Sequence, residues 1–360
     1  MLKIALIGCT GSIGRQVADV VRAHPDRFAF SALVAGRNCE ELSRLVEEFR
    51  PKTAFCASEG AKEELFDDCD IAFIACGGFA GLAYTLAAIK AGKRIALANK
   101  ESLVCGGELV TKAANKAGVE IVPVDSEHSA IFQALSFRKD TPFKKLVLTA
   151  SGGPFLRYTE EQLKTATAKD ALRHPTWNMG AKITIDSATL LNKGYEIIEA
   201  KWLYGADFAQ IETVVHPESI VHSLVYFEDG AAIAQLSYPD MRLPIQLALT
   251  YPHRLPCEES LDLARIGALH FERLPEEKFP CFTLALKAGK EGGTCPTILN
   301  AAAEVAVSAF LGGSIPFPKI AETILCTLER IPRENCDSFE TLQTVDMRAR
   351  TYASQFIYGK

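Results

Sequence analysis

The chain has 360 residues, too many for one ordinary hydrophobic core, so we expect two or three domains. Hydrophobic residues make up 48% and charged residues 23% of the chain, a balance typical of a soluble globular protein. The formal net charge of −5 argues against sequence-independent binding of nucleic acid, and no apolar run is long enough to cross a bilayer. Because the chain opens with a strand pattern and its 11 cysteines include no C-x-x-C pair, we expect a cytoplasmic protein with reduced thiols.

The first 120 residues are typical of a nucleotide-binding domain. A short apolar strand over residues 3–8 leads into a glycine-rich turn over residues 8–14, spaced G-x-x-G-x-x-G, and then into an amphipathic helix. Glycines let the backbone approach a ligand, and the free N–H groups of the helix start can bind a pyrophosphate. Such turns also occur for packing alone; the position between first strand and first helix favours a dinucleotide site.

The second strand, over residues 29–34, ends in Gly36, Arg37 and Asn38. An NAD site usually has an acidic residue here to hold the ribose 2′-hydroxyl, whereas an arginine can take the 2′-phosphate. We therefore predict NADPH as the cofactor. The alternative is that Arg37 is an ordinary solvated surface residue.

Further buried strands are expected over residues 70–76 and 94–98, with a helix over 82–90 between them. This rhythm predicts an α/β fold with a Rossmann-like, doubly wound parallel sheet. The last strand ends in Asn99, Lys100 and Glu101, at the carboxyl edge where such sheets bind ligands. The alternative is a polar loop that caps the next helix.

Asp125 and Glu127 lie between an apolar strand and a helical pattern over residues 130–135. In extended backbone their spacing places both carboxylates on one face, where they could share a divalent cation. The alternative is a helix cap whose acids favour the helix dipole.

Two loops in the next part of the chain carry candidate binding groups. Ser151 precedes two glycines after a strand beginning at Lys145, and this turn could bind a phosphate or be a plain turn. Residues 157–173 predict one polar, exposed helix. Trp177 then stands in a loop between proline and glycine, either as a lid over a ligand or as a plug of the core.

A helix is expected to begin at Asp186 or Ser187 and to run to about Tyr204. Gly194 inside this helix costs about 1 kcal/mol relative to alanine. We interpret that cost as tolerable where a ligand comes close to the backbone.

Asn192, Lys193 and Glu196 can share one face of this helix because they are three and four residues apart. They would supply phosphate donors and a third carboxylate for a cation. A solvated helix face is the alternative.

The remainder of the chain reads as support for the site. Alternating patterns after residue 214 predict an antiparallel or mixed sheet. The position of His222 on a strand face favours a structural role over that of a metal ligand. We expect a central α+β catalytic domain over 121–256, a connecting segment over 257–280, and a C-terminal helical bundle over 281–360 without catalytic motifs.

These motifs, in this order, resemble the 1-deoxy-D-xylulose 5-phosphate reductoisomerase family of the non-mevalonate isoprenoid pathway over nearly the whole chain. The stretches that carry the resemblance are 8–14, 98–102, 123–128, 151–155, 174–177, 186–189, 192–194 with Glu196, and 216–219. The family's reaction is a metal-dependent rearrangement followed by NADPH-linked reduction, which yields 2-C-methyl-D-erythritol 4-phosphate from the phosphorylated ketose. The resemblance also implies a homodimer.

The resemblance implies roles for individual residues. The implied ligands of Mg²⁺, Mn²⁺ or Co²⁺ are Asp125, Glu127 and Glu196, which together with Lys100 form the catalytic set. The implied substrate-binding residues are Lys100, Ser126, Glu127, Ser151, His174, Trp177, Ser187, Asn192, Lys193 and Glu196. The implied NADPH contacts are Thr10, Gly11, Ser12, Ile13, Gly36, Arg37, Asn38, Asn99, Glu101 and Gly180. Trp177 and Met179 resemble a flexible lid.

The chain departs from the family pattern between residues 53 and 76, where it is shorter and keeps one short helical piece over 59–66. Residues 76–78 also differ. Two other functions remain open from the residues alone: a metal-independent NADPH dehydrogenase of another phosphorylated substrate, and a non-catalytic nucleotide-binding protein.

Overall fold

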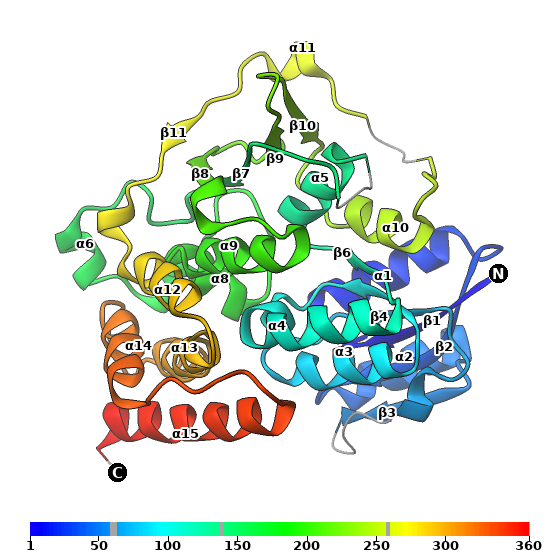
Figure 1. Ribbon diagram of the computed structural model, residues 1–360, viewed down its shortest axis with the longest axis horizontal. Helices are drawn as coiled ribbons and strands as arrows, with labels where there is room; N and C mark the ends of the chain where they lie inside the picture. Colours follow the sequence, from blue (N-terminus) through cyan, green and yellow to red (C-terminus); the bar gives the residue numbers. More distant parts are fainter. Residues whose placement is uncertain (58–62, 137–139, 257–259, 360) are drawn as a thin grey trace.

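The computed structural model describes residues 1–57, 63–136, 140–256 and 260–359. Two sheets and a group of C-terminal helices organise them (Figure 1). In the first sheet all strands are parallel. Its strand order is β3 (Thr53–Cys56), β2 (Phe28–Ala35), β1 (Leu2–Ile7), β4 (Ile71–Ile74), β5 (Arg94–Leu97) and β6 (Ile121–Pro123). The predicted doubly wound parallel sheet is confirmed.

The winding of this sheet reverses between β1 and β4. The chain runs from β1 outward to β2 and β3, and then returns to add β4, β5 and β6 on the other side of β1. The connecting helices are α1 (Ser12–Ala23), α2 (Cys39–Phe49), α3 (Ala80–Lys90) and α4 (Lys100–Ala117). Ligands of such sheets bind at the carboxyl ends of the strands where the order reverses, so the crevice is expected beside the β1–α1 turn.

The second sheet is mixed, as predicted. Its order is β10 (Ala232–Leu236), β9 (Val221–Tyr226), β7 (Lys145–Ala150), β8 (Ile211–Val215) and β11 (Glu272–Arg273). Only the β7–β8 pair is parallel among its pairings. Helices α5 (Ser126–Ala134) and α9 (Leu191–Tyr204) pack against this sheet, and α10 (Arg242–Thr250) packs against α1 and β5 of the first one.

Two helix predictions are wrong in their boundaries. Residues 157–173 form two short helices, α6 (Glu160–Lys164) and α7 (Ala168–Ala171), because Thr159 and Thr167 each begin a new helix with a capping box. Asp186 and Ser187 do not begin the long helix. They lie inside α8 (Ala181–Ala188). The helical conformation is then interrupted at Leu190, whose φ of 55° is left-handed, before α9 begins.

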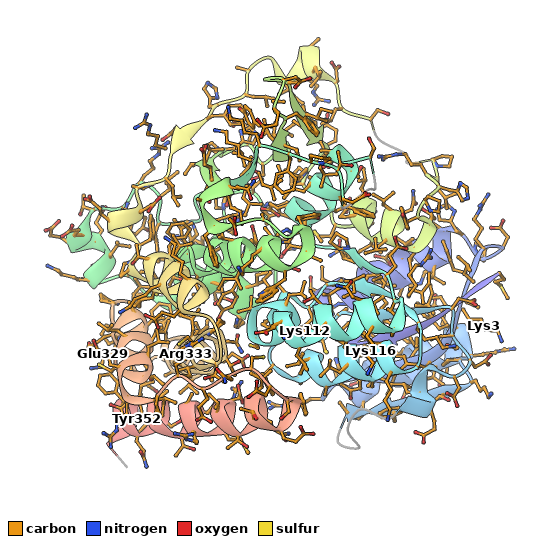
Figure 2. The ribbon with its side chains drawn as sticks, viewed as in Figure 1. Lys3, Lys112, Lys116, Glu329, Arg333 and Tyr352 are labelled. Atoms are coloured by element: carbon orange, nitrogen blue, oxygen red, sulfur yellow. A yellow bond between two sulfur atoms is a disulfide. The ribbon has the colours of Figure 1, made fainter. Side chains whose placement is uncertain are left out.

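The C-terminal part is helical, as predicted. Its helices are α12 (Pro280–Glu291), α13 (Cys295–Leu311), α14 (Lys319–Arg330) and α15 (Phe339–Tyr358). Helix α13 is largely apolar and buried, and it packs against α14 and α15 on one side and α4 on another. Figure 2 shows side chains filling the spaces between these helices, while Lys112 and Lys116 of α4 are exposed.

The segment before this bundle contains only short elements: α11 (Leu263–Ile266), β11 and the 3₁₀ turn η4 (Glu276–Lys278). Residues 257–259 of the predicted connection lie outside the described residues. In the shortened region of the first domain a 3₁₀ turn, η2 (Glu63–Phe66), covers part of the predicted helical piece, and residues 58–62 are not described. Among the described residues, no helix is both long and apolar enough to cross a membrane.

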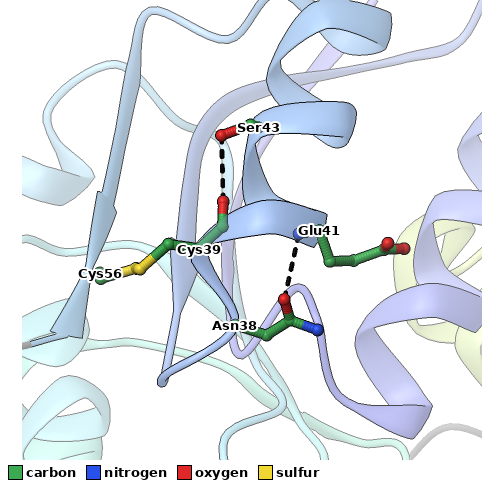
Figure 3. Close-up of a disulfide and its surroundings, with 5 residues drawn as sticks. All are labelled: Asn38, Cys39, Glu41, Ser43 and Cys56. Carbon is green, nitrogen blue, oxygen red and sulfur yellow. Dashed lines mark hydrogen bonds between the residues drawn. A yellow bond between two sulfur atoms is a disulfide. The ribbon is translucent and has the colours of Figure 1, made fainter.

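The expectation of entirely reduced thiols is not met, because the structure joins Cys39 and Cys56 (Figure 3). Cys39 begins α2 just after β2, and Cys56 ends β3. Since β2 and β3 pair in parallel, both cysteines reach the same edge, with their Cα atoms 6.4 Å apart. Every other cysteine that the structure describes is free.

Candidate active site

A cavity of about 720 Å³ lies between α1 of the first sheet and the strand ends of the second. It brings together residues from segments far apart in the chain. The predicted site residues along its wall are Ser12, Ile13, Lys100, Asp125, Ser126, Glu127, Ser151, His174, Trp177, Met179, Gly180, Ser187, Asn192, Lys193 and Glu196.

Three carboxylates converge in this cavity. One oxygen from each of Asp125, Glu127 and Glu196 lies within 4.8 Å of the other two. The route to this arrangement differs from the predicted extended segment, because Asp125 occupies the N-cap position of α5 and Glu127 lies in its first turn. Asp125 makes no side-chain capping bond, so its carboxylate faces the cluster instead.

Two lysines neutralise most of this negative charge. Lys100 Nζ lies 2.5 Å from Asp125 and 3.3 Å from Glu196, and Lys193 Nζ lies 2.8 Å from Glu127 and also contacts Glu196. Burial alone would lower the pKa of Lys100, but the neighbouring carboxylates outweigh it and hold that pKa well above its usual value. For Glu127, burial and Glu196 together raise the pKa.

This donor set fits a divalent cation. All three ligating groups are carboxylates, which hard cations such as Mg²⁺ and Mn²⁺ prefer, and Glu196 is only 1% exposed. Three carboxylates and two ammonium groups leave a net charge of −1, so the cluster still attracts a cation.

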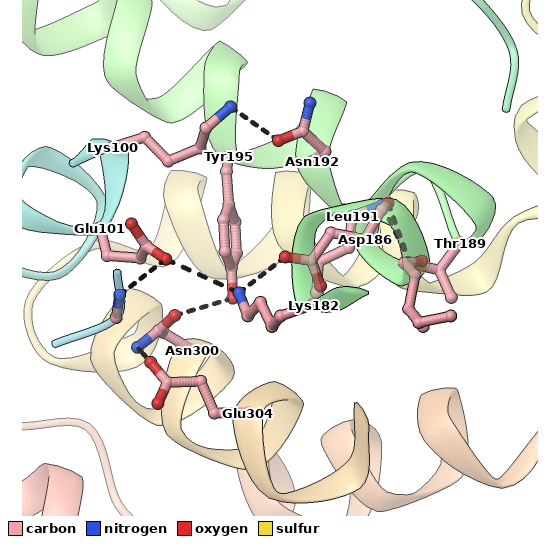
Figure 4. Close-up of polar contacts among 12 residues, drawn as sticks. Lys100, Glu101, Lys182, Asp186, Thr189, Leu191, Asn192, Tyr195, Asn300 and Glu304 are labelled. Atoms are coloured by element: carbon pink, nitrogen blue, oxygen red, sulfur yellow. Dashed lines mark hydrogen bonds and ion pairs between the residues drawn. The ribbon is translucent and has the colours of Figure 1, made fainter. Parts of the chain in front are cut away.

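The face of α9 is arranged as predicted. Asn192 Nδ2 donates to Glu196 Oε1 at 2.5 Å. Lys100 Nζ donates to Asn192 Oδ1 at 2.6 Å, as Figure 4 shows. Glu196 and Lys193 are buried, which excludes a solvated helix face.

The interpretation of Gly194 is wrong. A Cβ at this position would lie 2.4 Å from the Cβ of Ala285 on α12. Gly194 therefore allows two helices to pack closely, and no ligand is needed to explain it.

Three hydroxyl and imidazole groups form a small polar pocket beside the carboxylates. His174 Nε2 lies 3.0 Å from Ser151 Oγ and 3.2 Å from Ser187 Oγ. His174 Nδ1 accepts hydrogen bonds from the backbone N–H groups of Thr176 and Trp177, so the ring proton of the neutral form belongs on Nε2. Burial lowers the pKa of His174 to about 4. The pocket thus presents neutral donors that suit an anion such as a phosphate.

Trp177 lies on the cavity wall and is half-buried. Its ring and that of His222 are arranged edge to face, with their centroids 6.1 Å apart. Trp177 is therefore not a plug of the core. His222 Nε2 lies 3.2 Å from the carbonyl oxygen of Ser237, in agreement with a structural role, although its ring also borders the cavity.

Apart from Gly180, which lines the cavity, the predicted cofactor residues fall into three groups. Ser12 and Ile13 line the cavity, next to Thr10 and Gly11 in the β1–α1 turn. A second group, Gly36, Arg37 and Asn38, is exposed at the end of β2. The Asn38 side chain accepts a hydrogen bond from Glu41 N at 3.1 Å and so caps α2.

Asn99 and Glu101 form the third group and face a loop, not the cavity. Asn99 Nδ2 donates to the carbonyl oxygens of Cys76 (2.9 Å) and Gly78 (3.0 Å), and Glu101 Oε1 accepts from Gly78 N at 3.1 Å. These residues fix the loop that follows β4.

The cavity also includes residues that sequence reasoning missed. On α1 these are Arg15, Gln16 and Asp19. Ser219 precedes β9, and Asp240, Met241 and Arg242 follow β10. The first three follow the glycine-rich turn at helical spacing, which is the signal that could have found them. Ser219 lies in the 216–219 stretch that carries the family resemblance, but no role was assigned to it, and residues 240–242 carry no motif.

Comparison with known proteins gives concordant matches along the chain. The family model of 1-deoxy-D-xylulose 5-phosphate reductoisomerase matches residues 4–70 and 66–107, and two models of its C-terminal domain match residues 121–204 and 236–352. The protein of that name from Geobacillus sp. (strain WCH70) is 49% identical, and the match covers 99% of this chain and 100% of that one. The Bacillus subtilis protein is 46% identical with the same coverage.

Solved structures agree. A crystal structure of DOX-P reductoisomerase in complex with NADPH, fosmidomycin and magnesium is similar with a TM-score of 0.93 and 39% identity, covering 99% of this chain and 98% of that one. The Zymomonas mobilis reductoisomerase in complex with NADPH gives a TM-score of 0.91 and 37% identity, with 100% of both chains covered.

Proposed function

Because the chain belongs to the 1-deoxy-D-xylulose 5-phosphate reductoisomerase family, we propose that the cavity residues described above carry out that family's reaction. The protein is an NADPH-dependent oxidoreductase that uses a divalent cation. It converts 1-deoxy-D-xylulose 5-phosphate into 2-C-methyl-D-erythritol 4-phosphate, a step in isoprenoid precursor biosynthesis.

The observation that carries the residue assignment is the position of the carboxylate cluster. Asp125, Glu127 and Glu196 share one cavity with a neutral anion pocket and with Ser12 of the glycine-rich turn. In this proposal the three carboxylates hold the cation. When bound, a divalent cation supplies Lewis-acid stabilisation of negative charge on the substrate's keto and hydroxyl oxygens.

The substrate's phosphate is assigned to the pocket of Ser151, His174 and Ser187, with Asn192 and Lys193 of the same cavity as further contacts. Neutral donors and one ammonium group can bind a phosphate without the cost of burying many unpaired charges. The two ends of the substrate would then lie against different walls of one cavity, and this fixes its orientation.

Lys100 and Ser126 are assigned to the reacting end. Lys100 Nζ already donates to Asn192 Oδ1, and Ser126 Oγ donates to Glu127 Oε2 at 2.5 Å. Both donors can therefore reach an oxygen of the substrate that is close to the carboxylates. A buried ammonium group in this position stabilises negative charge that develops on that oxygen.

Trp177 and Met179 are assigned to a lid. The loop that contains them runs from His174 to Gly180, and it lines the cavity next to the anion pocket. A large apolar ring there keeps water away from the reacting atoms.

NADPH is assigned to the β1–α1 turn, with Thr10, Gly11, Ser12 and Ile13 near its pyrophosphate. The residues assigned around the rest of the cofactor are Gly36, Arg37, Asn38, Asn99, Glu101 and Gly180. Arg37, exposed at the end of β2, is the candidate for the 2′-phosphate.

The proposal also covers the organisation of the chain. Residues 1–120 bind NADPH, residues 121–256 hold metal and substrate, residues 257–280 connect, and residues 281–360 form a helical support. We expect a cytoplasmic homodimer. The strand β10 is an edge strand with Ile233 exposed, which is a feature that a partner would cover, and light scattering of the purified protein tests the oligomeric state.

The deciding experiment follows NADPH oxidation with 1-deoxy-D-xylulose 5-phosphate, with and without Mg²⁺ or Mn²⁺, and identifies the product. Metal-dependent formation of 2-C-methyl-D-erythritol 4-phosphate is expected. Full activity after removal of metal with a chelator would instead favour a metal-independent dehydrogenase. NADPH binding with no turnover would favour a non-catalytic nucleotide-binding protein.

A further inference from the structure

The loop between β4 and α3, residues 75–79, lies beside the glycine-rich turn, at the edge of the first sheet where the dinucleotide crevice is expected. It follows β4 at the point where the strand order of the parallel sheet reverses. It also packs against the glycine-rich turn, since a Cβ on Gly8 would lie 2.6 Å from the carbonyl carbon of Ala75. The shape of this loop therefore affects how closely a dinucleotide can approach the turn.

Asn99 and Glu101, at the carboxyl end of β5, provide the first anchor of this loop. They hold the carbonyl oxygens of Cys76 and Gly78 and the N–H group of Gly78. Glu101 also lies 3.7 Å from Lys182, which follows the lid and pairs with Asp186 at 2.6 Å (Figure 4).

A second anchor comes from the C-terminal helices, to which the sequence assigned no chemistry. Phe79 N donates to Glu304 Oε1 of α13 at 3.3 Å, and the Phe79 ring stacks on that of Phe339 with centroids 5.9 Å apart. Gly78 has a φ of +75°, and a Cβ there would lie 2.8 Å from Glu304 Oε1. Loop and carboxylate thus fit each other closely.

The carboxylate of Glu304 is itself fixed in direction. It accepts hydrogen bonds from Asn300 Nδ2 and from Arg350 of α15, both at 2.8 Å. Arg350 is held in turn by Asp346 at 2.6 Å. Asn300 Oδ1 accepts a hydrogen bond from Tyr195 OH of α9 at 3.2 Å. Tyr195 is the residue before Glu196 of the carboxylate cluster. These contacts, made by residues of three helices, distinguish Glu304 from an ordinary surface residue in a single ion pair.

We propose that Glu304 is a positioning residue for NADPH, which acts through Gly78 and Phe79 of the β4–α3 loop. It borders no part of the cavity among the described residues, and it lies 225 positions away from Phe79 in the sequence. Its loss should therefore weaken NADPH binding and leave the metal site unchanged. The inference rests on the proposed function only for the identity of the cofactor.

The test measures the NADPH dissociation constant by fluorescence titration without substrate, for the wild type, Glu304→Ala and Glu304→Asp. We expect at least about a fivefold weaker affinity in both variants. In Glu304→Ala the N–H group of Phe79 loses its acceptor, and in Glu304→Asp the shorter side chain places the carboxylate too far from it. Mn²⁺ binding, followed by electron paramagnetic resonance, should stay at the wild-type value. The Asp variant keeps the negative charge beside Arg350. If the Ala variant does not fold, the NADPH affinity of the Asp variant tests the proposal.

Glu334→Gln is the matched control, because Glu334 forms an exposed ion pair with Arg348 in the same group of helices at 2.6 Å. It should bind NADPH as the wild type does. NADPH affinity within twofold of wild type in a folded Glu304 variant would overturn the proposal, as would an equal loss in the control. Because turnover is not measured here, a wild type inactive on 1-deoxy-D-xylulose 5-phosphate would count against the proposed function alone.

Discussion

The carboxylate cluster and the exposed end of β2 at Arg37 hold charged side chains in opposite environments. In the cluster, Asp125, Glu127 and Glu196 are enclosed and each is paired with a buried lysine. At the end of β2, Gly36, Arg37 and Asn38 are exposed to solvent. A buried charge network depends on every member, whereas a solvated charge contributes little to the fold. Substitutions should therefore have large effects in the first region and small, ligand-specific effects in the second.

The largest effect is expected for Glu196→Gln, which removes a proposed metal ligand and leaves Lys100 and Lys193 short of a carboxylate. Turnover should fall by at least about a hundredfold, because a bound cation supplies several kcal/mol of charge stabilisation. NADPH binding, measured by fluorescence titration, should remain. Glu212→Gln at the exposed Lys145 pair is the control and should keep full activity. Near-normal turnover of Glu196→Gln with metal bound would show that the ligand is misassigned.

A second enclosed position is Gly194, and Gly194→Ala should destabilise the protein. The new Cβ would lie 2.4 Å from that of Ala285, and overpacking of this kind costs roughly 1–3 kcal/mol. Urea unfolding measures the effect. The compensating double variant Gly194→Ala, Ala285→Gly should recover part of the loss, and no recovery would contradict close helix packing as the reason for the glycine.

In burial, His174 lies between the enclosed carboxylate cluster and the exposed end of β2. It is half-buried, and burial lowers its pKa to about 4. The unfolded chain, with an ordinary histidine pKa near about 6.5, binds the proton more readily than the folded protein. Stability from this group should be fully present above pH ~6.5 and decline as the pH falls towards 4. Denaturant unfolding at several pH values should show a shallower acid decline for His174→Gln. Equal declines in both proteins would contradict the assignment.

The smallest effect is expected at the exposed end. Arg37→Ala should weaken NADPH binding about tenfold, equivalent to ~1.4 kcal/mol, through loss of one charge-assisted contact to the 2′-phosphate. Binding of NADH should hardly change, because NADH lacks that phosphate. Arg44→Ala, on the exposed face of α2 beside Glu40, is the control. Equal weakening for NADPH and NADH would indicate that Arg37 has another role.

The difference between the two regions also explains what the sequence could predict. Local patterns sufficed for the parallel sheet, for the glycine-rich turn and for the shared α9 face of Asn192, Lys193 and Glu196, because each depends on spacing within a few residues. The break between α8 and α9 was missed, since it depends on a left-handed Leu190 that no propensity favours.

Several contacts between distant segments could not be predicted from the sequence. Nothing near Glu304 pointed to Phe79, and nothing near Cys39 pointed to Cys56, because each pair is brought together by the sheet and the packing around it. The resemblance to a known family supplied the roles of Ser151 and His174, where the spacing alone left a plain turn open. Asp125 and Glu127 converge as predicted, but through a helix start and not through an extended strand.

The contact between Phe79 and Glu304 has a consequence for the order of events during synthesis. The parallel sheet is complete once residue 123 has left the ribosome, but its β4–α3 loop lacks the Glu304 anchor until α13 follows. At about 5–20 residues per second, the 225 positions between the two residues take roughly 10–45 s to translate. The nascent first domain should therefore reach its sheet topology well before it can hold NADPH with the affinity of the finished protein.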